Sequence, residues 1–371
     1  VRIIRSCHDM EKPIKNLKAK CEAMRTTGYE IPKIAFMPKT LADVSDMFRE
    51  AESMTDYEHI LCAMGPMGQV TRILAYKLHS YLTYVSPEET EGNIPAIGHI
   101  DPVTLNDVYR FRALSDRTAL YAVTGWPLAK TSSPALHNEG YKINNIDALL
   151  FPLRSPSVSD VLDCAASLGV RGLAVTVPHK EAVIPELIKL DSEAQAIGAC
   201  NTVVRTDEGW TGCNTDAYGF QTALLRFLGV KKLRHRRVAV IGAGGAAKAV
   251  AYVVQSLGAK ACIFNRTLSH AKALAERYGF DYAPLGPEAA KKIEKYADII
   301  VQTTSKGINS DGEASKDGDP LYFYQFTGTE TVFDLVYVPA CRHTDYGACF
   351  GSGLQNVQRC GNAQVSGLQA V

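Results

Sequence analysis

The sequence predicts an α/β protein in which parallel strands alternate with helices, first as a partial βα barrel and then as two further α/β domains. Two observations predict this class. Short apolar runs of strand length alternate along the chain with helix-length amphipathic patterns, which is the rhythm of parallel sheets. The length of 371 residues, at roughly 150 residues per domain, indicates two or three domains.

The first domain is expected over residues 1–110 as half of a βα barrel. Apolar runs at residues 1–7, 31–37, 59–64 and 81–85 predict four strands, and the patterns at 41–54 and 70–79 predict helices. Because four strands make half of an eight-stranded barrel, we expect an unpaired edge strand and the other half upstream in a longer polypeptide. Three polar residues fall on or just beyond these elements, where such folds place their chemistry: His8, Lys33 and Arg72.

Two more domains follow a linker rich in proline and glycine at residues 93–101. The second is expected over residues 111–228, with strands at 149–153 and 173–177 and a helix that starts between Ser157 and Ser159. The third is expected over residues 229–340, with strands at 237–241, 261–264 and 299–302 in βαβ units. Each domain is long enough to bury a core of its own.

The composition indicates a small-molecule partner. Lys and Arg number 40 against 39 Asp and Glu, so no basic surface indicates nucleic acid and no acidic tail indicates disorder. The ten cysteines lack paired metal spacing, so we expect reduced thiols, without disulfides and without a metal site. No apolar run approaches the roughly 20 residues of a membrane helix, and residues 1–8 resemble a strand rather than a signal peptide. We therefore expect a soluble protein of the cytoplasm or of an organelle.

The third domain carries a nucleotide-binding motif. The apolar run at 238–241 leads into Gly242-Ala-Gly-Gly-Ala-Ala247, and a helix pattern follows at 249–257. This matches the G-x-G-x-x-G/A fingerprint of a dinucleotide site, in which glycines let the backbone approach a pyrophosphate at the helix N-terminus. The candidate cofactor-binding residues of the turn are Gly242, Ala243, Gly244, Gly245 and Ala246.

The residues after the next strand indicate which dinucleotide binds. An NAD site carries Asp or Glu about 20 residues beyond the glycines, where it holds a ribose hydroxyl. This chain has Asn265, Arg266 and Thr267 instead, a guanidinium with neutral donors that suits a phosphate. The prediction is NADP, and the alternative is a mononucleotide turn beside an ordinary surface arginine.

Two strings upstream carry candidate acid-base residues, Val175-Thr-Val-Pro-His-Lys180 and Gly212-Cys-Asn-Thr-Asp216. An ammonium beside a carboxylate is a proton donor whose acidity the carboxylate sets. Together with a dinucleotide site, Lys180 and Asp216 predict hydride transfer coupled to proton transfer. Taken singly, each string has another interpretation, because Lys180 could be a surface lysine and the residues before Asp216 an Asx turn.

Five ordered motifs resemble those of the shikimate dehydrogenase family. They are Gly125-Trp-Pro127-Leu-Ala-Lys-Thr131-Ser-Ser133-Pro134-Ala-Leu-His137-Asn138, Val175-Thr176-Val-Pro178-His-Lys180, Gly198-Ala-Cys-Asn201-Thr202, Asn214-Thr-Asp216, and the glycine turn with Asn265-Arg-Thr267. In addition, Asp334-Leu-Val-Tyr337-Val-Pro339 resembles the family's closing strand. The resemblance covers residues 119–340 and implies a substrate domain followed by a Rossmann NADP-binding domain.

That resemblance implies reduction of 3-dehydroshikimate to shikimate, a step of aromatic amino-acid biosynthesis. Lys180 would give its proton to the ketone oxygen, which is worth roughly 10²–10⁴-fold in rate, and Asp216 would orient the lysine. The implied substrate ligands are Thr131, Ser133, Thr176, Asn201 and Tyr337. In the family a C-terminal helix returns to the substrate domain with a glutamine, so we expect residues 341–371 to return there, with Gln364 as the candidate glutamine.

The first domain resembles the second half of a type I 3-dehydroquinate dehydratase. The matching strings are Ser6-Cys-His8-Asp, Ile31-Pro-Lys33-Ile-Ala-Phe-Met37 and Met64-Gly-Pro-Met-Gly-Gln-Val-Thr-Arg72. The resemblance implies that Lys33 forms a Schiff base with the ketone, that His8 moves the proton and that Arg72 binds the carboxylate. The family's loop Ser-Ala-Pro-Gly-Gln corresponds here to Pro95-Ala-Ile-Gly-His99 and lacks its hydroxyl and amide. We therefore expect no dehydratase turnover by this chain alone.

Two alternatives to a shikimate dehydrogenase stay open. Thr131 stands where the family has a serine, and its methyl group narrows the pocket, which leaves open the choice between shikimate and the bulkier quinate. A non-catalytic regulator of the quinate pathway would resemble the same enzymes. The proton-transfer groups His8, Lys33, Lys180 and Asp216 argue against a regulator, because a sensor does not need them.

Overall fold

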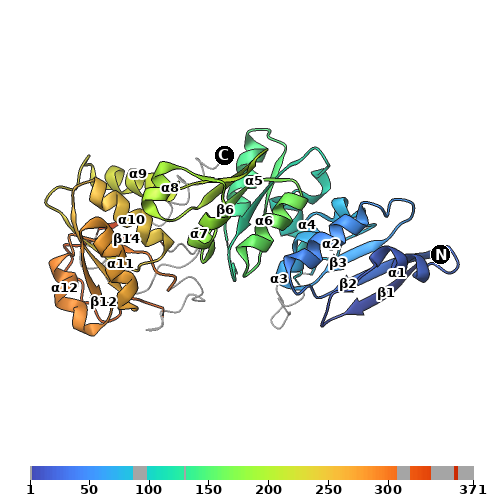
Figure 1. The fold of residues 1–371 in the computed structure, drawn as a ribbon, viewed down its shortest axis with the longest axis horizontal. Helices are drawn as coiled ribbons and strands as arrows, with labels where there is room; N and C mark the ends of the chain where they lie inside the picture. The colour runs from blue at the N-terminus through green and yellow to red at the C-terminus, as the bar shows by residue number, and fades with distance from the viewer. Residues whose placement is uncertain (1, 87–97, 129–130, 307–317, 336–354, 358–371) are drawn as a thin grey trace. The chain divides into compact units, whose positions relative to one another are not determined.

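The computed structural model describes residues 2–86, 98–128, 131–306, 318–335 and 355–357. The chain divides into two compact units. The first contains Val1–Lys189 with Thr202–Thr211, and the second contains Leu190–Asn201 with Gly212–Val371. Both units are built from helices and mainly parallel strands, which confirms the predicted α/β class (Figure 1).

The N-terminal part of the first unit is a parallel sheet in the order β1-β2-β3. Its elements are β1 (Ile3–Asp9), α1 (Leu17–Met24), β2 (Glu30–Phe36), α2 (Leu41–Ala51), β3 (Ile60–Ala63), α3 (Gly65–Gly68), α4 (Val70–Ile73) and the 3-10 helix η1 (Ala75–Leu78). Among the described residues β1 pairs with β2 alone, and it leaves Ile3 56% and Ile4 43% exposed. This is the apolar edge expected of an open half barrel.

The prediction of a fourth strand at residues 81–85 is wrong, because these residues are described and form no strand. The predicted helix at 70–79 is split into α4 and η1, and the residue after η1, His79, has φ +50°. That left-handed residue ends η1, and the chain then makes a single bridge, between His59 and Ser80, outside any described strand. The apolar run therefore passes the sheet without extending it.

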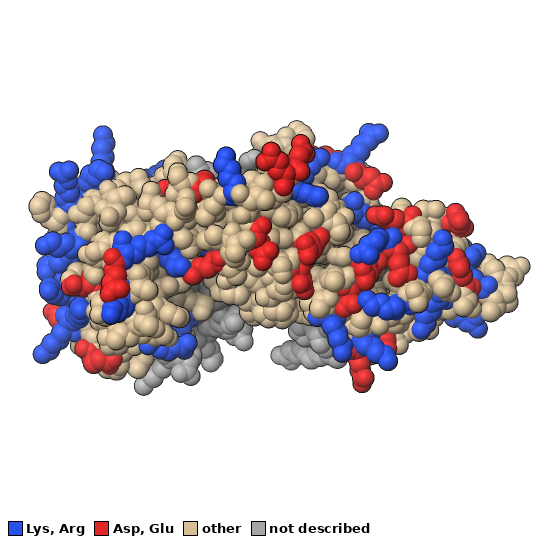
Figure 2. Space-filling model, in the orientation of Figure 1, with Lys and Arg blue, Asp and Glu red and all other residues tan. Residues whose placement is uncertain are grey.

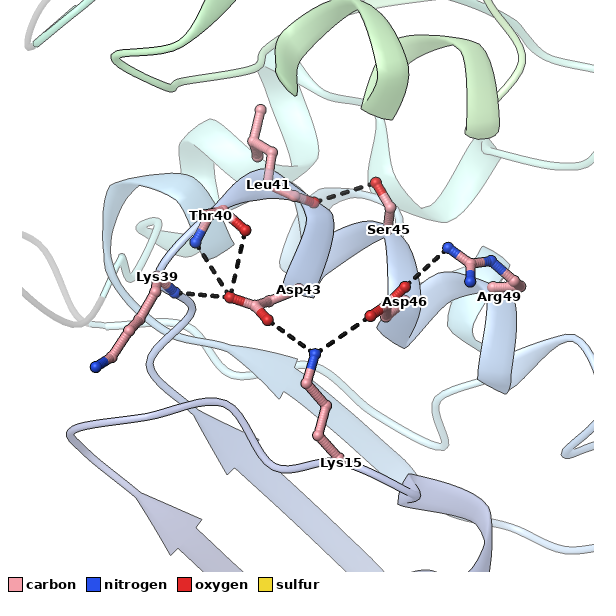
Figure 3. Close-up of polar contacts among 8 residues, drawn as sticks. All are labelled: Lys15, Lys39, Thr40, Leu41, Asp43, Ser45, Asp46 and Arg49. Carbon is pink, nitrogen blue, oxygen red and sulfur yellow. Dashed lines mark hydrogen bonds and ion pairs between the residues drawn. The ribbon is translucent and has the colours of Figure 1, made fainter. Parts of the chain in front are cut away.

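A network of polar contacts fixes the start of α2 (Figure 3). Asp43 Oδ2 accepts hydrogen bonds from the backbone N–H groups of Lys39 at 2.9 Å and Thr40 at 3.1 Å, and so satisfies donors at the start of the helix. The other oxygen of Asp43 lies 3.0 Å from Nζ of Lys15, which also lies 3.2 Å from Asp46. These contacts join the loop before α1 to α2.

A second, six-stranded sheet has the order β5-β4-β6-β8-β9-β7. Its strands are β4 (Ala119–Thr124), β5 (Ala148–Pro152), β6 (Val170–Val175), β7 (Lys189–Leu190), β8 (Thr202–Thr206) and β9 (Gly209–Cys213). β4, β5 and β6 are parallel, and β8 runs antiparallel to β6. The predicted strands at 149–153 and 173–177 correspond to β5 and β6, whereas β7, β8 and β9 were not predicted.

The helices around this sheet are η3 (Thr104–Val108, a π-helical turn), η4 (Phe111–Ala113), α5 (Ser133–Ile143), α6 (Val158–Ser167), α7 (His179–Ala182) and η5 (Ile184–Glu186). The predicted helix start near residue 157 is confirmed, because the Ser157 hydroxyl accepts a hydrogen bond from the Asp160 N–H at 3.2 Å. Within the first unit, α6 packs against α2 of the N-terminal part (Figure 1). The half barrel is therefore in direct contact with this second sheet's helices.

The second unit contains a doubly wound sheet in the order β12-β11-β10-β13-β14-β15, with every pair parallel. Its elements are α8 (Ser192–Ile197), α9 (Asp216–Leu228), β10 (Arg237–Ile241), α10 (Gly245–Ser256), β11 (Lys260–Asn265), α11 (Leu268–Tyr278), β12 (Asp281–Pro284), η6 (Pro287–Ala289), α12 (Ala290–Lys295), β13 (Ile299–Gln302), β14 (Thr331–Asp334) and β15 (Gln355–Val357). The predicted strands 237–241 and 299–302 are β10 and β13.

Alternate residues of these strands enter two separate cores. Val238 and Val240 of β10 pack with α9, α10 and α11 on one face of the sheet. Ala239 and Ile241 pack with α12 and the aromatic ring of Tyr324 on the other face. Because a strand buried on both faces needs apolar residues at every position, β10 could be read from the sequence as a continuous apolar run.

Glu330, just before β14, is a buried carboxylate held by donors. Its oxygens accept hydrogen bonds from the Tyr324 hydroxyl at 3.0 Å and from the backbone N–H groups of Thr327 and Gly328 at about 3.0 Å. Burial by itself raises the pKa of the Glu330 carboxyl, but these hydrogen bonds outweigh burial and leave the pKa below its ordinary value. The loop before β14, which contains Thr327 and Gly328, is thereby held by hydrogen bonds to the Glu330 carboxylate.

The surface carries both signs of charge. On the face drawn in Figure 2, Lys and Arg are interspersed with Asp and Glu, in line with the counts of 40 and 39. Among the helices that the structure describes, none combines the length and apolar character needed to cross a bilayer.

Candidate functional site

The glycine turn of the second unit forms as predicted between β10 and α10. β10 ends at Ile241, Gly244 stands at the N-cap position in an extended conformation, and α10 begins at Gly245. A Cβ added at Gly244 would meet no heavy atom within 4 Å, so this residue faces open space. The first N–H groups of α10 are therefore accessible to an anion at the positive end of the helix dipole.

Gly242 is required for a different reason. Its φ of +117° lies in a region that L side chains rarely adopt, and an added Cβ would lie 2.4 Å from the Thr303 hydroxyl and 3.2 Å from Thr304. The Thr303 hydroxyl and N–H both donate to the Ile241 carbonyl, at 2.7 and 2.9 Å. The turn is thus packed against the end of β13.

The predicted cofactor-selecting residues lie at the end of β11. Asn265 is the last residue of β11, and its side-chain amide donates to the Thr267 carbonyl at 3.0 Å. Arg266 and Thr267 are exposed, and Thr267 stands at the N-cap of α11. Because β11 neighbours β10 in the sheet, Arg266 and the glycine turn follow the carboxyl ends of adjacent parallel strands.

The second unit also brings together two of the predicted substrate residues, Asn201 and Asp216. The Asn201 side-chain amide donates to Asp216 Oδ1 at 2.9 Å and to the Thr215 hydroxyl at 2.9 Å. Its carbonyl oxygen accepts the Thr215 N–H at 2.9 Å. Asn214 holds the same loop from the other side, since its side chain donates to the Ala199 carbonyl at 2.8 Å. The start of α9 and the Asn201 loop are therefore one hydrogen-bonded cluster.

The first unit carries Thr131 and Ser133 at the start of α5. The Thr131 hydroxyl lies 3.2 Å from the Ser133 hydroxyl and accepts the Ser133 N–H at 3.2 Å. Asn138, one turn further, is 2% exposed and makes two hydrogen bonds to the main chain of Leu150 in β5, at 2.9 and 2.7 Å. Asn138 therefore fixes the helix that presents the two hydroxyls, a role that the sequence motif did not reveal.

Thr176 directly follows β6, and Lys180 lies on α7, both in the first unit. The Thr176 N–H donates to the Thr124 carbonyl at 2.9 Å, and the Trp126 N–H donates to the Val177 carbonyl at 3.1 Å. Lys180 is partly buried on α7 beside His179, which is 2% exposed and contacts the Ser155 carbonyl through Nε2 at 2.8 Å. His179 was not assigned a role from the sequence, although it stands in the same motif. The pairing of Lys180 with Asp216 joins residues of two different units and stays a prediction.

Of the half-barrel residues, His8 lies near the end of β1, Lys33 lies in the middle of β2 and Arg72 lies on α4. Lys33 on β2 has Nζ 3.9 Å from the centroid of the Tyr84 ring. Partial burial, and then the charge of Lys33, lower the pKa of His8 on β1. Burial, followed by the charges of Arg72 and Lys33, also lowers the pKa of His99. Tyr84 and His99 are thus two further side chains that interact with Lys33.

Arg72 is 2% exposed in α4. Its Nη1 donates to the Ala63 carbonyl at 2.7 Å, and its Nε is buried without a hydrogen-bond partner among the described residues. A buried guanidinium with an unused donor is suited to an anionic group. Tyr337 and Gln364, also predicted, lie outside the described residues.

A doubly wound sheet with a glycine turn, preceded by a second α/β sheet with hydroxyl-bearing loops, defines a dinucleotide-dependent dehydrogenase of two domains. Family models match three segments of the chain, and two of these models are of dehydrogenase domains. The models of the type I 3-dehydroquinase, the shikimate dehydrogenase substrate binding domain and the shikimate / quinate 5-dehydrogenase match residues 1–116, 123–203 and 226–310.

Individual relatives identify the family. A shikimate dehydrogenase (NADP(+)) of Syntrophobacter fumaroxidans is 35% identical over 223 residues, which are 60% of this chain and 77% of that protein. The chain belongs to the shikimate dehydrogenase family. The bifunctional 3-dehydroquinate dehydratase/shikimate dehydrogenase of Arabidopsis thaliana, a chloroplastic protein, is 31% identical over 360 residues. This match covers 91% of the present chain but 57% of the plant protein.

A solved structure agrees with this assignment. The shikimate 5-dehydrogenase of Thermus thermophilus, in complex with NADP(H) and shikimate, superposes with a TM-score of 0.56 at 31% identity. The similarity covers 68% of this chain and 92% of that chain. The expected two-domain dehydrogenase fold is therefore confirmed.

Proposed function

We propose that this chain interconverts 3-dehydroshikimate and shikimate with NADP, as a shikimate dehydrogenase fused behind a dehydratase-like half barrel. The observation that carries the proposal is the arrangement of the second unit. There a glycine turn at the start of α10 and the Asn201–Asp216 cluster at the start of α9 occur in one compact body. The first suits a dinucleotide pyrophosphate, and the second suits the hydroxyl groups of a polyol substrate.

The cofactor site is assigned from the donors around it. The backbone of Gly242, Ala243, Gly244, Gly245 and Ala246 would hold the pyrophosphate, because Gly244 faces open space at a helix N-terminus. Arg266, flanked by Asn265 and Thr267, is exposed and positively charged, and would hold the 2′-phosphate that distinguishes NADP from NAD. Bound NADPH supplies the hydride for the reduction.

Side chains of the protein carry out the proton transfer. Lys180 donates a proton to the ketone oxygen of 3-dehydroshikimate as negative charge develops there, and takes it back when shikimate is oxidised. Asp216 keeps that lysine charged and oriented, and Asn201 keeps Asp216 in place through the 2.9 Å hydrogen bond. Thr176 and Asn201 hold ring hydroxyls, Thr131 and Ser133 hold the substrate carboxylate, and Tyr337 completes the ligand set.

The half barrel is proposed to be the second half of a dehydratase site. Arg72 would bind the substrate carboxylate with its unused Nε, Lys33 would form the Schiff base and His8 would transfer the proton. We propose that the remaining strands lie in a longer polypeptide and cover the exposed edge of β1, as the length of the plant relative suggests. By itself, the 371-residue chain is expected to leave 3-dehydroquinate unchanged, and turnover in a direct assay would contradict this.

The organisation beyond the site is also a proposal. We assign the half barrel to residues 1–110, the substrate domain to 111–228 and the cofactor domain to 229–340. The segment 341–371, which was expected to return to the substrate domain, lies outside the described residues except for β15, and β15 pairs with β14. The small-molecule substrate and NADP are the partners, without nucleic acid or membrane. The cytoplasm or an organelle is the proposed location.

The test is the rate of NADPH formation at saturating NADP with shikimate and, separately, with quinate. The proposal predicts turnover with shikimate, and a higher kcat/KM for shikimate than for quinate. A higher kcat/KM for quinate would favour the quinate-preferring alternative. Tight binding of either compound without NADPH formation would instead favour the non-catalytic regulator.

A further inference from the structure

One arginine joins the half barrel to the substrate domain inside the first unit. Arg154 follows β5, and its Nε donates to the Leu128 carbonyl at 2.9 Å. Its Nη1 donates to the side-chain oxygen of Gln69, which lies between α3 and α4 of the half barrel. Arg154 and Gln69 are both partly buried, and burial lowers the pKa of the Arg154 guanidinium. One planar group therefore contacts two segments that are distant in sequence.

The loop that Arg154 contacts is under backbone strain. Leu128 has φ +37°, within a region that branched side chains avoid. It lies in the segment between β4 and α5, which leads to Thr131 and Ser133. A strained residue persists only when its surroundings hold it, and the Arg154 hydrogen bond to the Leu128 carbonyl is a contact of that kind.

The same short segment also contacts the motif that carries Lys180. Ser155, the residue after Arg154, is 1% exposed, and its carbonyl lies 2.8 Å from Nε2 of the buried His179. Lys180 follows His179 directly on α7. A displacement of Arg154 would therefore reach Lys180 through Ser155 and His179, and would reach the Leu128 loop through the direct hydrogen bond.

The half-barrel end of the bridge is closely packed. An added Cβ at Gly68 would lie 2.3 Å from the Ala63 carbonyl, so α3 is packed closely on the end of β3. The Thr71 hydroxyl donates to the Gly68 carbonyl at 2.7 Å and accepts the Ala63 N–H at 3.1 Å. Gln69 is thus held on a fixed support, from which its amide oxygen can position the guanidinium.

We propose that Arg154 is a positioning residue of the dehydrogenase site, and that Gln69 of the half barrel keeps it in place. This inference rests on the proposed function and adds to it a role for the N-terminal part of the chain. The half barrel supports the geometry of the neighbouring substrate loop, in addition to any chemistry of its own. The dehydrogenase of this fused chain therefore depends on a residue outside the segment that matches dehydrogenase families.

The test compares Arg154→Ala, Gln69→Leu, the double variant and Gln69→Glu in the whole chain. Arg154→Ala is expected to raise KM for shikimate about tenfold, and Gln69→Leu about fivefold through loss of one hydrogen bond. The double variant should resemble Arg154→Ala alone, because both changes remove the same bridge. Gln69→Glu keeps an oxygen that can accept the Arg154 hydrogen bond, so its KM for shikimate should stay within about twofold of wild type. KM for NADP and the thermal midpoint of the Glu variant should not change.

A second measurement is independent of catalysis. Trp126 and Trp210 are the two tryptophans of the chain, so Trp210→Phe leaves Trp126, in the loop before Leu128, as the reporter. In that background, Arg154→Ala and Gln69→Leu should make Trp126 more accessible to acrylamide quenching, and Gln69→Glu should not. Additive KM effects, or an unchanged KM and unchanged quenching in Gln69→Leu, would overturn the inference. If the wild-type chain is inactive with shikimate but the variants show the expected quenching, the proposed function is rejected. The role of Arg154 in holding the loop would still stand.

Discussion

Two alanine substitutions in the glycine turn separate folding from cofactor binding. Gly242→Ala places a Cβ 2.4 Å from the Thr303 hydroxyl at a residue with φ +117°. The backbone conformation costs about 1–2 kcal/mol, and the displaced threonine about 1–3 kcal/mol more. The unfolding free energy of the cofactor-binding unit should therefore fall by about 2–5 kcal/mol, which lowers its thermal midpoint by roughly 5–15 °C.

Gly244→Ala is the matched control in the same turn. Gly244 has φ −86°, and its added Cβ would meet nothing within 4 Å, so the thermal midpoint should stay the same or rise slightly. The methyl group would stand where the pyrophosphate approaches, so NADP affinity should fall by about tenfold or more. Differential scanning calorimetry and a fluorescence titration with NADPH measure the two effects. Equal stability of Gly242→Ala and wild type, or a Gly244→Ala variant that binds NADP normally, would refute this account of the turn.

Three other predictions concern residues of the second unit. Arg266→Gln should raise KM for NADP about tenfold, through loss of a charge-assisted hydrogen bond, and leave KM for NAD unchanged; equal changes for both cofactors would contradict the assignment. Asn201→Ala removes the 2.9 Å hydrogen bond to Asp216 and should raise KM for shikimate about tenfold at constant KM for NADP, as initial rates would show. Because the folded pKa of Glu330 is lowered, its contribution to stability is present above the ordinary value of 4.5 and is lost as pH falls through the folded pKa. Glu330→Gln should therefore be less stable at pH 7 and show a flatter loss of stability below pH 4.5 in denaturant titrations; an unchanged acid profile would exclude this role.

The sequence predicted elements whose physical requirements are local. Residues 238–241 of β10 and 299–301 of β13 are buried and apolar at every position, so these strands could be read from the residues. The glycine turn was predictable because a tight turn before a helix demands residues without side chains. The helix start at Ser157 was also predictable from a local requirement, because the N-cap of a helix favours a short polar side chain.

Elements that depend on distant contacts were missed. The apolar run at 81–85 has the composition of a strand, but the chain makes only a single bridge, at Ser80, before it and forms no strand there. The short strands β7, β8 and β9 are partly exposed and lack a continuous apolar run, so they gave no signal.

The site shows the same division. Asn201 and Asp216 were named from their motifs, but the hydrogen bond between them became visible only in three dimensions. Asn138 and His179 stand inside recognised motifs, but the motifs did not reveal their contacts. The side chain of Asn138 binds main-chain atoms of Leu150, and that of His179 contacts the main-chain carbonyl of Ser155. Arg154 belongs to no recognised motif, and its partners come from other parts of the chain. Such roles follow from packing, which local sequence does not encode.

The central claim is that the side chain of Lys180 transfers the proton, and the kcat of Lys180→Ala tests it most directly. Steady-state NADP reduction by shikimate should be compared with wild type and with Lys189→Ala, an exposed lysine of the same unit. The account predicts that Lys180→Ala lowers kcat by roughly 10²–10⁴-fold, keeps the affinity for NADP, and that Lys189→Ala matches wild type. A kcat for Lys180→Ala within about twofold of wild type, far below the rate loss expected for a general acid, would contradict it.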